Sequence, residues 1–136
     1  MTSSNAVRLV RSTDLAAQAP YAYAAVTEAT ARLVVTAGAC PLDRDGRTVA
    51  VGDVAGQAEQ VMANLRTALR AAGADLDDVV KTTVYVATSD RADLLAAWAV
   101  VRRHFGDHDA PSTLLGVAVL GYQDQLVEVE AVAALG

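Results

Sequence analysis

The sequence contains one cysteine and few aromatic residues. Cys40 stands alone among 136 residues, so neither an intrachain disulfide nor a cysteine-based metal cluster can form. A reducing cytoplasm is the simplest setting for such a chain. Aromatic residues make up only 4% of the sequence, so the core must be built mainly from alanine, valine and leucine. Because small side chains bury little area each, oligomerisation would help a chain of this size.

Clustered basic residues and long apolar runs are also missing. The formal net charge is -5, Lys81 is the only lysine, and Arg102 and Arg103 form the only adjacent basic pair. Nucleic-acid binding needs a basic patch, so we do not expect a nucleic acid as partner. No stretch approaches the roughly 18 consecutive apolar residues of a membrane helix, and Met1–Arg11 lacks the apolar run of a signal peptide. We therefore expect a cytoplasmic protein without a membrane partner.

The sequence does contain enough apolar material for a packed core. Hydrophobic residues make up 53% and charged residues 20%, a composition typical of globular domains. No internal repeat, linker or low-complexity segment divides the chain. We therefore predict a single domain over residues 1–136.

Apolar residues at every third or fourth position predict two helices. The first begins after Asp53, a suitable N-cap, and ends near Ala72, with Gly73 placed as a C-cap glycine should be. The second runs from about Arg91 to Phe105. The residues expected on its inner face are Leu94, Leu95, Trp98, Val101 and Phe105.

Six segments favour strands because they alternate in polarity or are rich in β-branched residues. They are Ala6–Arg11, Tyr21–Val26, Ala31–Gly38, Asp77–Val86 after an acidic turn, Thr113–Leu120 and Leu126–Ala133. The element order is therefore β-β-β-α-β-α-β-β. This order predicts an α+β fold in which two helices pack on one face of a mixed sheet.

Three separated motifs, in the expected order, resemble the Rid/YjgF family of reactive intermediate deaminases. They are AAGADLDDVVKTTVYV at Ala71–Val86, VVTAGACPLDRDG at Val34–Gly46 and LVEVEAVAAL at Leu126–Leu135. The resemblance covers nearly the whole chain. It implies a chorismate-mutase-like fold and a homotrimer with a small-molecule pocket between each pair of subunits.

The resemblance also identifies a departure from the family pattern. In members that hydrolyse imines or enamines, an arginine binds the substrate carboxylate through two parallel hydrogen bonds. Ser112 occupies that place here, and no arginine occurs after Arg103. Losing a charged hydrogen bond costs roughly 1.5–3 kcal/mol, enough to redirect specificity. We therefore expect a substrate that is less anionic or more apolar than an amino-acid imine.

Other pocket positions carry over from the family in part. Tyr21 matches the pocket tyrosine and Glu128 the glutamate that holds the attacking water, so these two are the predicted catalytic residues. The predicted ligand-binding residues are Ser112, Thr113, Leu114, Ala37 and Gly38. Ala37 replaces a common serine, and Leu114 falls where a cysteine often lies. No cofactor and no metal is expected.

Each of these assignments has a simpler alternative. Glu128 is either a proton-handling group or a solvated or paired carboxylate like Glu130. Tyr21 either contacts a ligand or packs at a subunit edge. Ser112 either donates to a ligand or is a turn residue after Pro111.

The remaining candidates carry weaker signals. Cys40 is expected to be a small buried side chain rather than a nucleophile, because no histidine is near it in sequence. A metal site at His104 and His108 is not expected, because a glycine interrupts the helix between them. Whether one of these histidines, Arg102 or Arg103 replaces the missing positive charge stays open.

Three functions are compatible with these patterns. The first is a cofactor-independent enzyme acting on an imine, an enamine or a related intermediate, by hydrolysis, tautomerisation, cyclisation or condensation. The second is a non-catalytic small-molecule-binding or chaperone-like trimer. The third is the nuclease activity attributed to some relatives, which the acidic charge and the missing arginine disfavour.

Overall fold

The computed structural model describes residues 6–28 and 31–136. Its elements follow the predicted order, with one added 3-10 turn, η1. The elements are β1 (Val7–Val10), β2 (Ala24–Thr27), β3 (Arg32–Val35), α1 (Val54–Ala71), η1 (Leu76–Asp78), β4 (Val79–Ala87), α2 (Arg91–Phe105), β5 (Ser112–Val117) and β6 (Val127–Leu135). The start of the predicted strand at Ala31 lies next to residues 29–30, which fall outside the described residues.

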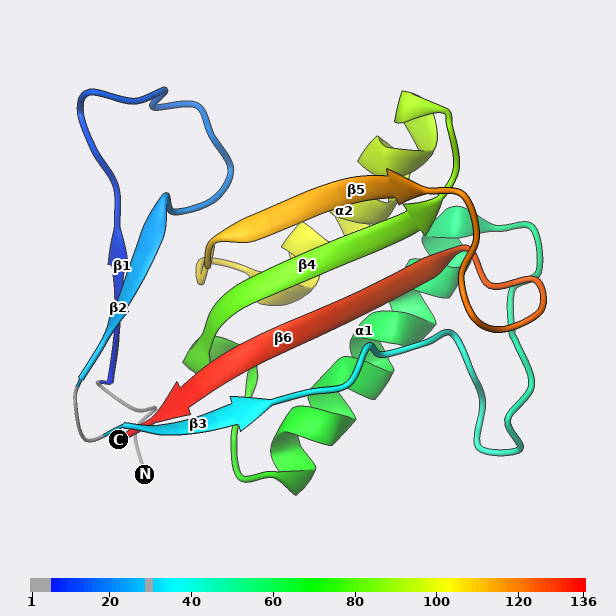
Figure 1. Ribbon diagram of the computed structural model, residues 1–136, viewed down its shortest axis with the longest axis horizontal. Helices are drawn as coiled ribbons and strands as arrows, with labels where there is room; N and C mark the ends of the chain where they lie inside the picture. Colours follow the sequence, from blue (N-terminus) through cyan, green and yellow to red (C-terminus); the bar gives the residue numbers. More distant parts are fainter. Residues whose placement is uncertain (1–5, 29–30) are drawn as a thin grey trace.

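Four strands form the main sheet in the order β3-β6-β4-β5. The β4–β5 pair is parallel and the other pairs are antiparallel, so the sheet is mixed. Helices α1 and α2 lie on one face of this sheet, while β1 and β2 form a separate antiparallel hairpin beside it (Figure 1). The predicted α+β architecture, with both helices on one face, is confirmed.

The core lies between the sheet and the two helices. Alternate residues of β6 face the helices, and they pack with the apolar stripe of α1; the buried set includes Val127, Val129, Met62, Leu65 and Leu69. Alternation then places Glu128 and Glu130 on the opposite, open face of the sheet. Within the described ranges, no helix has both the length and the apolar character that crossing a bilayer requires.

The ends of both helices confirm the predicted caps. The Asp53 side chain accepts a hydrogen bond from the backbone N–H of Gly56 at 2.9 Å. Gly73 adopts φ +88° directly after the C-cap of α1, and Gly106 adopts φ +60° at the end of α2. Both glycines reverse the chain in a conformation that other residues rarely adopt.

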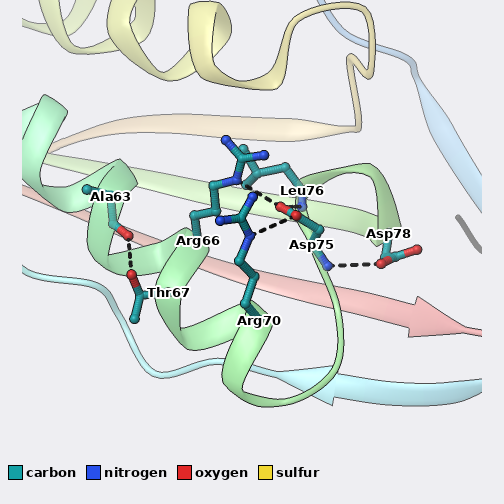
Figure 2. Close-up of polar contacts among 7 residues, drawn as sticks. All are labelled: Ala63, Arg66, Thr67, Arg70, Asp75, Leu76 and Asp78. Carbon is teal, nitrogen blue, oxygen red and sulfur yellow. Dashed lines mark hydrogen bonds and ion pairs between the residues drawn. The ribbon is translucent and has the colours of Figure 1, made fainter.

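The turn between α1 and β4 is held by polar contacts around Asp75 (Figure 2). Asp75 Oδ1 accepts from the backbone N–H of Leu76 at 2.8 Å, and Asp78 Oδ2 accepts from that of Asp75 at 2.9 Å, a reciprocal capping box on η1. Arg66 and Arg70 of α1 donate to the two carboxylate oxygens of Asp75 at 3.1 and 2.9 Å. These bonds connect the last turns of α1 to the start of β4.

One predicted core residue is on the surface instead. Leu95 was expected on the inner face of α2, but it is 59% exposed. Neighbouring helix residues are about 100° apart around the axis, so Leu94 and Leu95 cannot both point at the sheet. Leu94 packs against the core, and Leu95 lies at the edge of a groove.

Three predicted strands differ from the observed ones in their bounds: two extend too far at their ends, and one begins too early. The segment Ala31–Gly38 leaves the regular ladder after Val35, where Ala37 and Gly38 bulge. The segment Thr113–Leu120 is regular only to Val117. The segment Tyr21–Val26 becomes a strand only at Ala24. Before it, the Ala22 N–H donates to the carbonyl of Asp109 at 2.7 Å and not to β1, and Tyr21 lines the groove.

Candidate functional site

Glu128 lies on the open face of β6, directly opposite Tyr85 of β4. Its Oε1 accepts a hydrogen bond from Gln125 Nε2 at 3.1 Å and a weaker one from Cys40 Sγ at 3.5 Å. The carboxylate is only partly buried. One of its oxygens is therefore held by two donors while the group keeps access to the open face.

Oε2, the other carboxylate oxygen of Glu128, lies against Gly38. Thr36 bonds Ala131 of β6 and Ala39 bonds Val129. The chain advances three residues from Thr36 to Ala39, whereas their partners on β6 are two residues apart. This extra residue is the count of a β-bulge. A Cβ on Gly38 would come within 2.1 Å of Glu128 Oε2. A glycine is therefore required for the carboxylate to lie as it does, and Ala37 is exposed beside it.

Cys40 is a proton donor to this carboxylate. Burial, the charge of Glu128 and the hydrogen bond with Glu128 together raise the pKa of the thiol to about 11, while a bond with Gln125 lowers it. Near neutral pH the side chain is thus a thiol and not a nucleophilic thiolate. The prediction that Cys40 is no nucleophile fits this chemistry, but the prediction of a buried, purely apolar role is wrong: Cys40 is half-buried and contacts Glu128.

Two glutamines that sequence patterns did not single out hold the loop before β6. Gln57 of α1 donates to the carbonyl of Asp124 at 2.9 Å and accepts from the backbone N–H of Leu126 at 2.7 Å. Gln125, between them, contacts Glu128 directly. Both glutamines are buried. A lone glutamine has no characteristic spacing in sequence, so only the tertiary contacts identify this pair.

Glu130 behaves as the paired carboxylate that the sequence suggested for it. Its Oε1 accepts a hydrogen bond from the Tyr85 hydroxyl at 2.6 Å. This bond, with burial and the charges of Glu130 and Glu128, raises the pKa of Tyr85. Tyr85 therefore stays protonated beside Glu128, on the same face of the sheet.

Ser112 lies on the opposite, helix-covered side of the sheet. Thr82 is buried among the core residues, and its hydroxyl donates to Ser112 Oγ at 2.6 Å. Thr113 points to the open face, where its hydroxyl accepts from Lys81 Nζ at 2.6 Å. Leu114 pairs with buried Val84 and packs against the core.

A groove of about 470 Å³ runs along the Ser112 edge of the sheet. Its lining is mainly apolar: Pro20, Tyr21, Leu95, Trp98, Ser112, Thr113 and Leu114. The volume falls in the range of small-molecule sites. The Tyr21 ring packs edge-on against Tyr23, with 5.8 Å between ring centroids. The structure therefore gathers Tyr21 with the Ser112–Leu114 segment.

The four candidate replacements for the missing cation have different surroundings. Arg103 and His104 both pair with Glu59 on α1, which lowers the pKa of that carboxyl. His108 Nε2 lies 2.7 Å from the carbonyl oxygen of Val79. Arg102 borders a cavity of about 10 Å³ beneath Ser112, room for about one water molecule. Among the described residues, no three His, Cys, Asp or Glu side chains are grouped as metal ligands would be.

The predicted site residues thus form two clusters in one chain. Ser112 is opposite Thr82, Glu128 is opposite Tyr85, and β5 and β6 flank β4. Strand geometry then separates the Cα atoms of Ser112 and Glu128 by roughly 14 Å, with side chains on opposite faces. Glu128, Gly38 and Ala37 form one cluster. Tyr21 lies with Ser112, Thr113 and Leu114 in the other.

Comparisons with known proteins agree with the three motifs. A family model described as endoribonuclease L-PSP matches residues 11–135. RutC family protein UK114 of Drosophila melanogaster is 35% identical over 135 residues, covering 98% of this chain and 94% of the fly protein. A human protein named 2-iminobutanoate/2-iminopropanoate deaminase is 32% identical over 135 residues, with the same shares covered, 98% and 94%.

Solved structures show the same fold. The Rid-family protein YyfB of Yersinia pestis, described as of unknown function, superposes with a TM-score of 0.88 at 30% identity, over 96% of this chain and 99% of that one. The YjgF gene product of E. coli gives a TM-score of 0.65 at 30% identity, over 93% and 97% of the two chains. The relatives include both proteins named as imine deaminases and proteins without an assigned reaction.

Proposed function

The chain belongs to the Rid/YjgF family, and from this premise we propose that it is an enzyme acting on an imine, an enamine or a related small molecule. The observation that carries the proposal is the Glu128 carboxylate. Its Oε1 accepts hydrogen bonds from Gln125 and Cys40, while Oε2 lies against Gly38, where there is no side chain. A carboxylate with one oxygen held, and the other without a hydrogen bond among the described residues, suits proton transfer.

Hydrolysis at this carboxylate takes two steps. A water molecule adds to the carbon of the C=N bond while Glu128 Oε2 takes a proton from it. Glu128 then passes that proton to the nitrogen as the C=N double bond becomes single, which gives a carbinolamine. In the second step Glu128 takes the proton of the new hydroxyl and delivers it to the amine, so that the C–N bond breaks, ammonia leaves, a carbonyl product forms and the carboxylate is regenerated. Tautomerisation would use the same carboxylate to move a proton between carbon and nitrogen.

The proposed pocket lies between subunits of a homotrimer. Within one chain, Ser112 and Glu128 are too far apart, and on the wrong faces, to hold one small molecule. A neighbouring subunit that brings its Ser112 groove to Glu128 would complete the site. Exposed aliphatic side chains on the open face, Leu33 and Val35 on the edge strand β3 and Leu115 on the opposite edge strand β5, support such an assembly.

The lining of the groove indicates which chemical group of the substrate binds there. Trp98, Leu95 and Leu114 offer apolar surface, and Ser112 offers a hydroxyl where relatives use an arginine. We expect an apolar or neutral polar group there, with Tyr21 against it. Arg102 borders a space that holds about one water molecule, which does not favour Arg102 as the replacement for the guanidinium. The lone cysteine fits a cytoplasmic location.

The test follows imines generated by an amino-acid oxidase, with semicarbazide trapping the imine that remains. We expect little acceleration for imines of short aliphatic amino acids and clear acceleration for imines with large apolar groups. Rapid hydrolysis of the short aliphatic imines would show that the carboxylate anchor has not been lost. Arg102→Gln in the same assay then decides whether Arg102 supplies it.

The alternative is a non-catalytic binder, which the absence of any arginine after Arg103 supports equally well, because the charged anchor of a reacting carboxylate is then missing. Binding and turnover separate the two functions. If Glu128→Gln keeps ligand affinity but loses turnover, the protein is an enzyme. If no imine or enamine is turned over while ligands bind in the groove, it is a binder. The family description names an endoribonuclease, but the net charge of -5 does not favour RNA.

A further inference from the structure

Gln125 uses its whole side-chain amide in hydrogen bonds around Glu128. The residue is 4% exposed. Its Nε2 donates to the carbonyl of Val127 and to Glu128 Oε1, each at 3.1 Å. Its Oε1 accepts from the backbone N–H of Tyr122, also at 3.1 Å. Both amide hydrogens and the amide oxygen are therefore engaged.

Only one orientation of this amide satisfies its neighbours. Rotating it by 180° would place its oxygen against the Val127 carbonyl and the Glu128 carboxylate, and its N–H groups against the N–H of Tyr122. All three contacts would become repulsive. Gln125 consequently presents an N–H donor to Glu128 at all times, in contrast to a solvated amide that can turn over.

We propose that Gln125 is a positioning residue: it holds Oε1 of Glu128 so that Oε2, above Gly38, is the oxygen that exchanges protons with the substrate. The reactive role of Oε2 rests on the proposed function, whereas the holding of Oε1 does not. Cys40 supplies the second donor to Oε1. With that oxygen engaged, Oε2 is left for the reaction.

Gln57 of α1 holds the loop that contains Gln125. Gln57, fully buried on that helix, bonds the backbone on both sides of Gln125, at Asp124 and at Leu126. Asp124 has φ +63°, a conformation that disfavours residues other than glycine, asparagine and aspartate. The bond from Gln57 stabilises this turn, and Gln125 is thereby aimed at β6.

Positioning matters because a glutamate side chain on an open sheet face has three rotatable bonds. A misplacement of about 1 Å at a reacting group can reduce the rate about 100-fold. A buried amide on a fixed loop limits that motion without adding a charge.

The activity test uses Gln125→Met, which keeps length and volume but removes all three hydrogen bonds. We expect kcat on the best apolar imine to fall about 10- to 100-fold while KM stays within about twofold, because substrate binding in the groove is untouched. Thr48→Val is the matched control. It removes another bond to the same loop, from Thr48 Oγ1 to the Gln123 carbonyl, without touching Glu128, and should leave kcat unchanged. A folded Gln125→Met variant with wild-type kcat overturns the proposal.

A second measurement needs no substrate. Cys40 is the only cysteine, and the pH dependence of its alkylation by iodoacetamide reports its pKa. If Gln125 holds Glu128 beside the thiol, Gln125→Met frees the carboxylate and the pKa of Cys40 falls from about 11, since Glu128 raises it more than Gln125 lowers it. If Glu128 stays in place without Gln125, the pKa rises instead, and the proposal is wrong.

A double-mutant cycle tests whether the change in the Cys40 pKa comes from Glu128. In a Glu128→Gln background, Gln125→Met should no longer lower the Cys40 pKa, because the charge that it releases is absent. The same downward change in both backgrounds would assign it to a general loosening of the loop and overturn the proposal. If wild-type protein turns over no imine but the cycle gives the expected result, the proposed function fails while the positioning of Glu128 stands.

Discussion

The carboxylate of Glu128 lies against the backbone of Gly38 so closely that a methyl group on Gly38 would come within 2.1 Å of Oε2. This contact connects two segments that are far apart in the sequence, because Gly38 follows β3 and Glu128 lies in β6, the last strand. It also explains why a glycine belongs at this position although its backbone is not left-handed.

Gly38→Ala is expected to impair proton transfer and not folding. The new methyl group displaces the flexible end of Glu128, so we expect kcat to fall about 100-fold and the free energy of unfolding to change by less than about 1 kcal/mol. Gly121→Ala is the matched control, since nothing lies within 4 Å of its added Cβ. Steady-state kinetics and urea unfolding measure both. Equal kcat values for the two variants would contradict the role of Oε2.

Glu128→Gln is expected to make Cys40 more reactive. Burial still raises the pKa of the thiol, but the charge of Glu128 no longer does, so the pKa falls from about 11 toward the ordinary value of 9.0. Each unit of decrease raises the thiolate fraction about tenfold, and lower intrinsic nucleophilicity reduces the net gain to about three- to fourfold. Iodoacetamide labelling at pH 8, followed by mass spectrometry, measures the rate. A rate equal to that of wild type would place Glu128 away from the thiol.

Ser112→Arg is expected to restore recognition of carboxylate-bearing imines. A charged hydrogen bond of about 1.5–3 kcal/mol corresponds to a gain of about 10- to 100-fold in kcat/KM for 2-iminobutanoate. Ser112→Met is the control, because it also removes the acceptor for the Thr82 hydroxyl but adds no charge. Semicarbazone formation measures both variants. No gain with arginine, in a folded protein, would favour the non-catalytic binder.

Val35→Asp is expected to prevent assembly. Val35 is 71% exposed in the single chain, so the carboxylate costs a monomer little, but burial of the charge in a subunit interface is unfavourable. Val51→Asp, at 62% exposure in a loop away from the sheet, is the control. Light scattering should give a trimer for wild type and Val51→Asp and a smaller species for Val35→Asp. A monomeric wild-type protein would remove the inter-subunit pocket.

Asp75→Asn is expected to lower stability at neutral pH but not in acid. Burial raises the pKa of Asp75, but the Leu76 N–H, Arg70 and Arg66 outweigh it, so the pKa is lowered on folding. A carboxyl with a lowered folded pKa adds stability above its unfolded pKa of about 3.9, and this is lost as pH falls through the folded value. Because the pair is partly exposed, we expect about 0.5–1 kcal/mol at pH 7.

Urea unfolding of Asp75→Asn at pH 7 and at pH 3 measures this difference. Asp77→Asn removes the same charge from the same turn and serves as the control, since Asp77 is exposed and makes neither of the arginine contacts that Asp75 makes. A loss for Asp75→Asn that persists undiminished at pH 3 would assign the effect to packing and not to charge.

The sequence by itself determined the elements and the family. Apolar spacing and caps at Asp53 and Gly106 predicted the helices, because these signals are local. The three motifs predicted the Rid/YjgF membership, which the match over residues 11–135 confirms. The absence of any arginine after Arg103 was also readable directly, whereas Ser112 as the position of the family arginine stays a prediction. The single domain over residues 1–136 and the site residues stay predictions.

Only the tertiary structure decided how the site is built. That Gln125 and Cys40 hold Glu128 depends on a loop, a bulge and a strand meeting, and no sequence period encodes such a meeting. The exposure of Leu95 likewise follows from how α2 sits on the sheet. The separation of Ser112 from Glu128 depends on strand order and on the faces of the pleat. Local sequence sets which residues alternate, but the pairing of distant strands sets which of them meet.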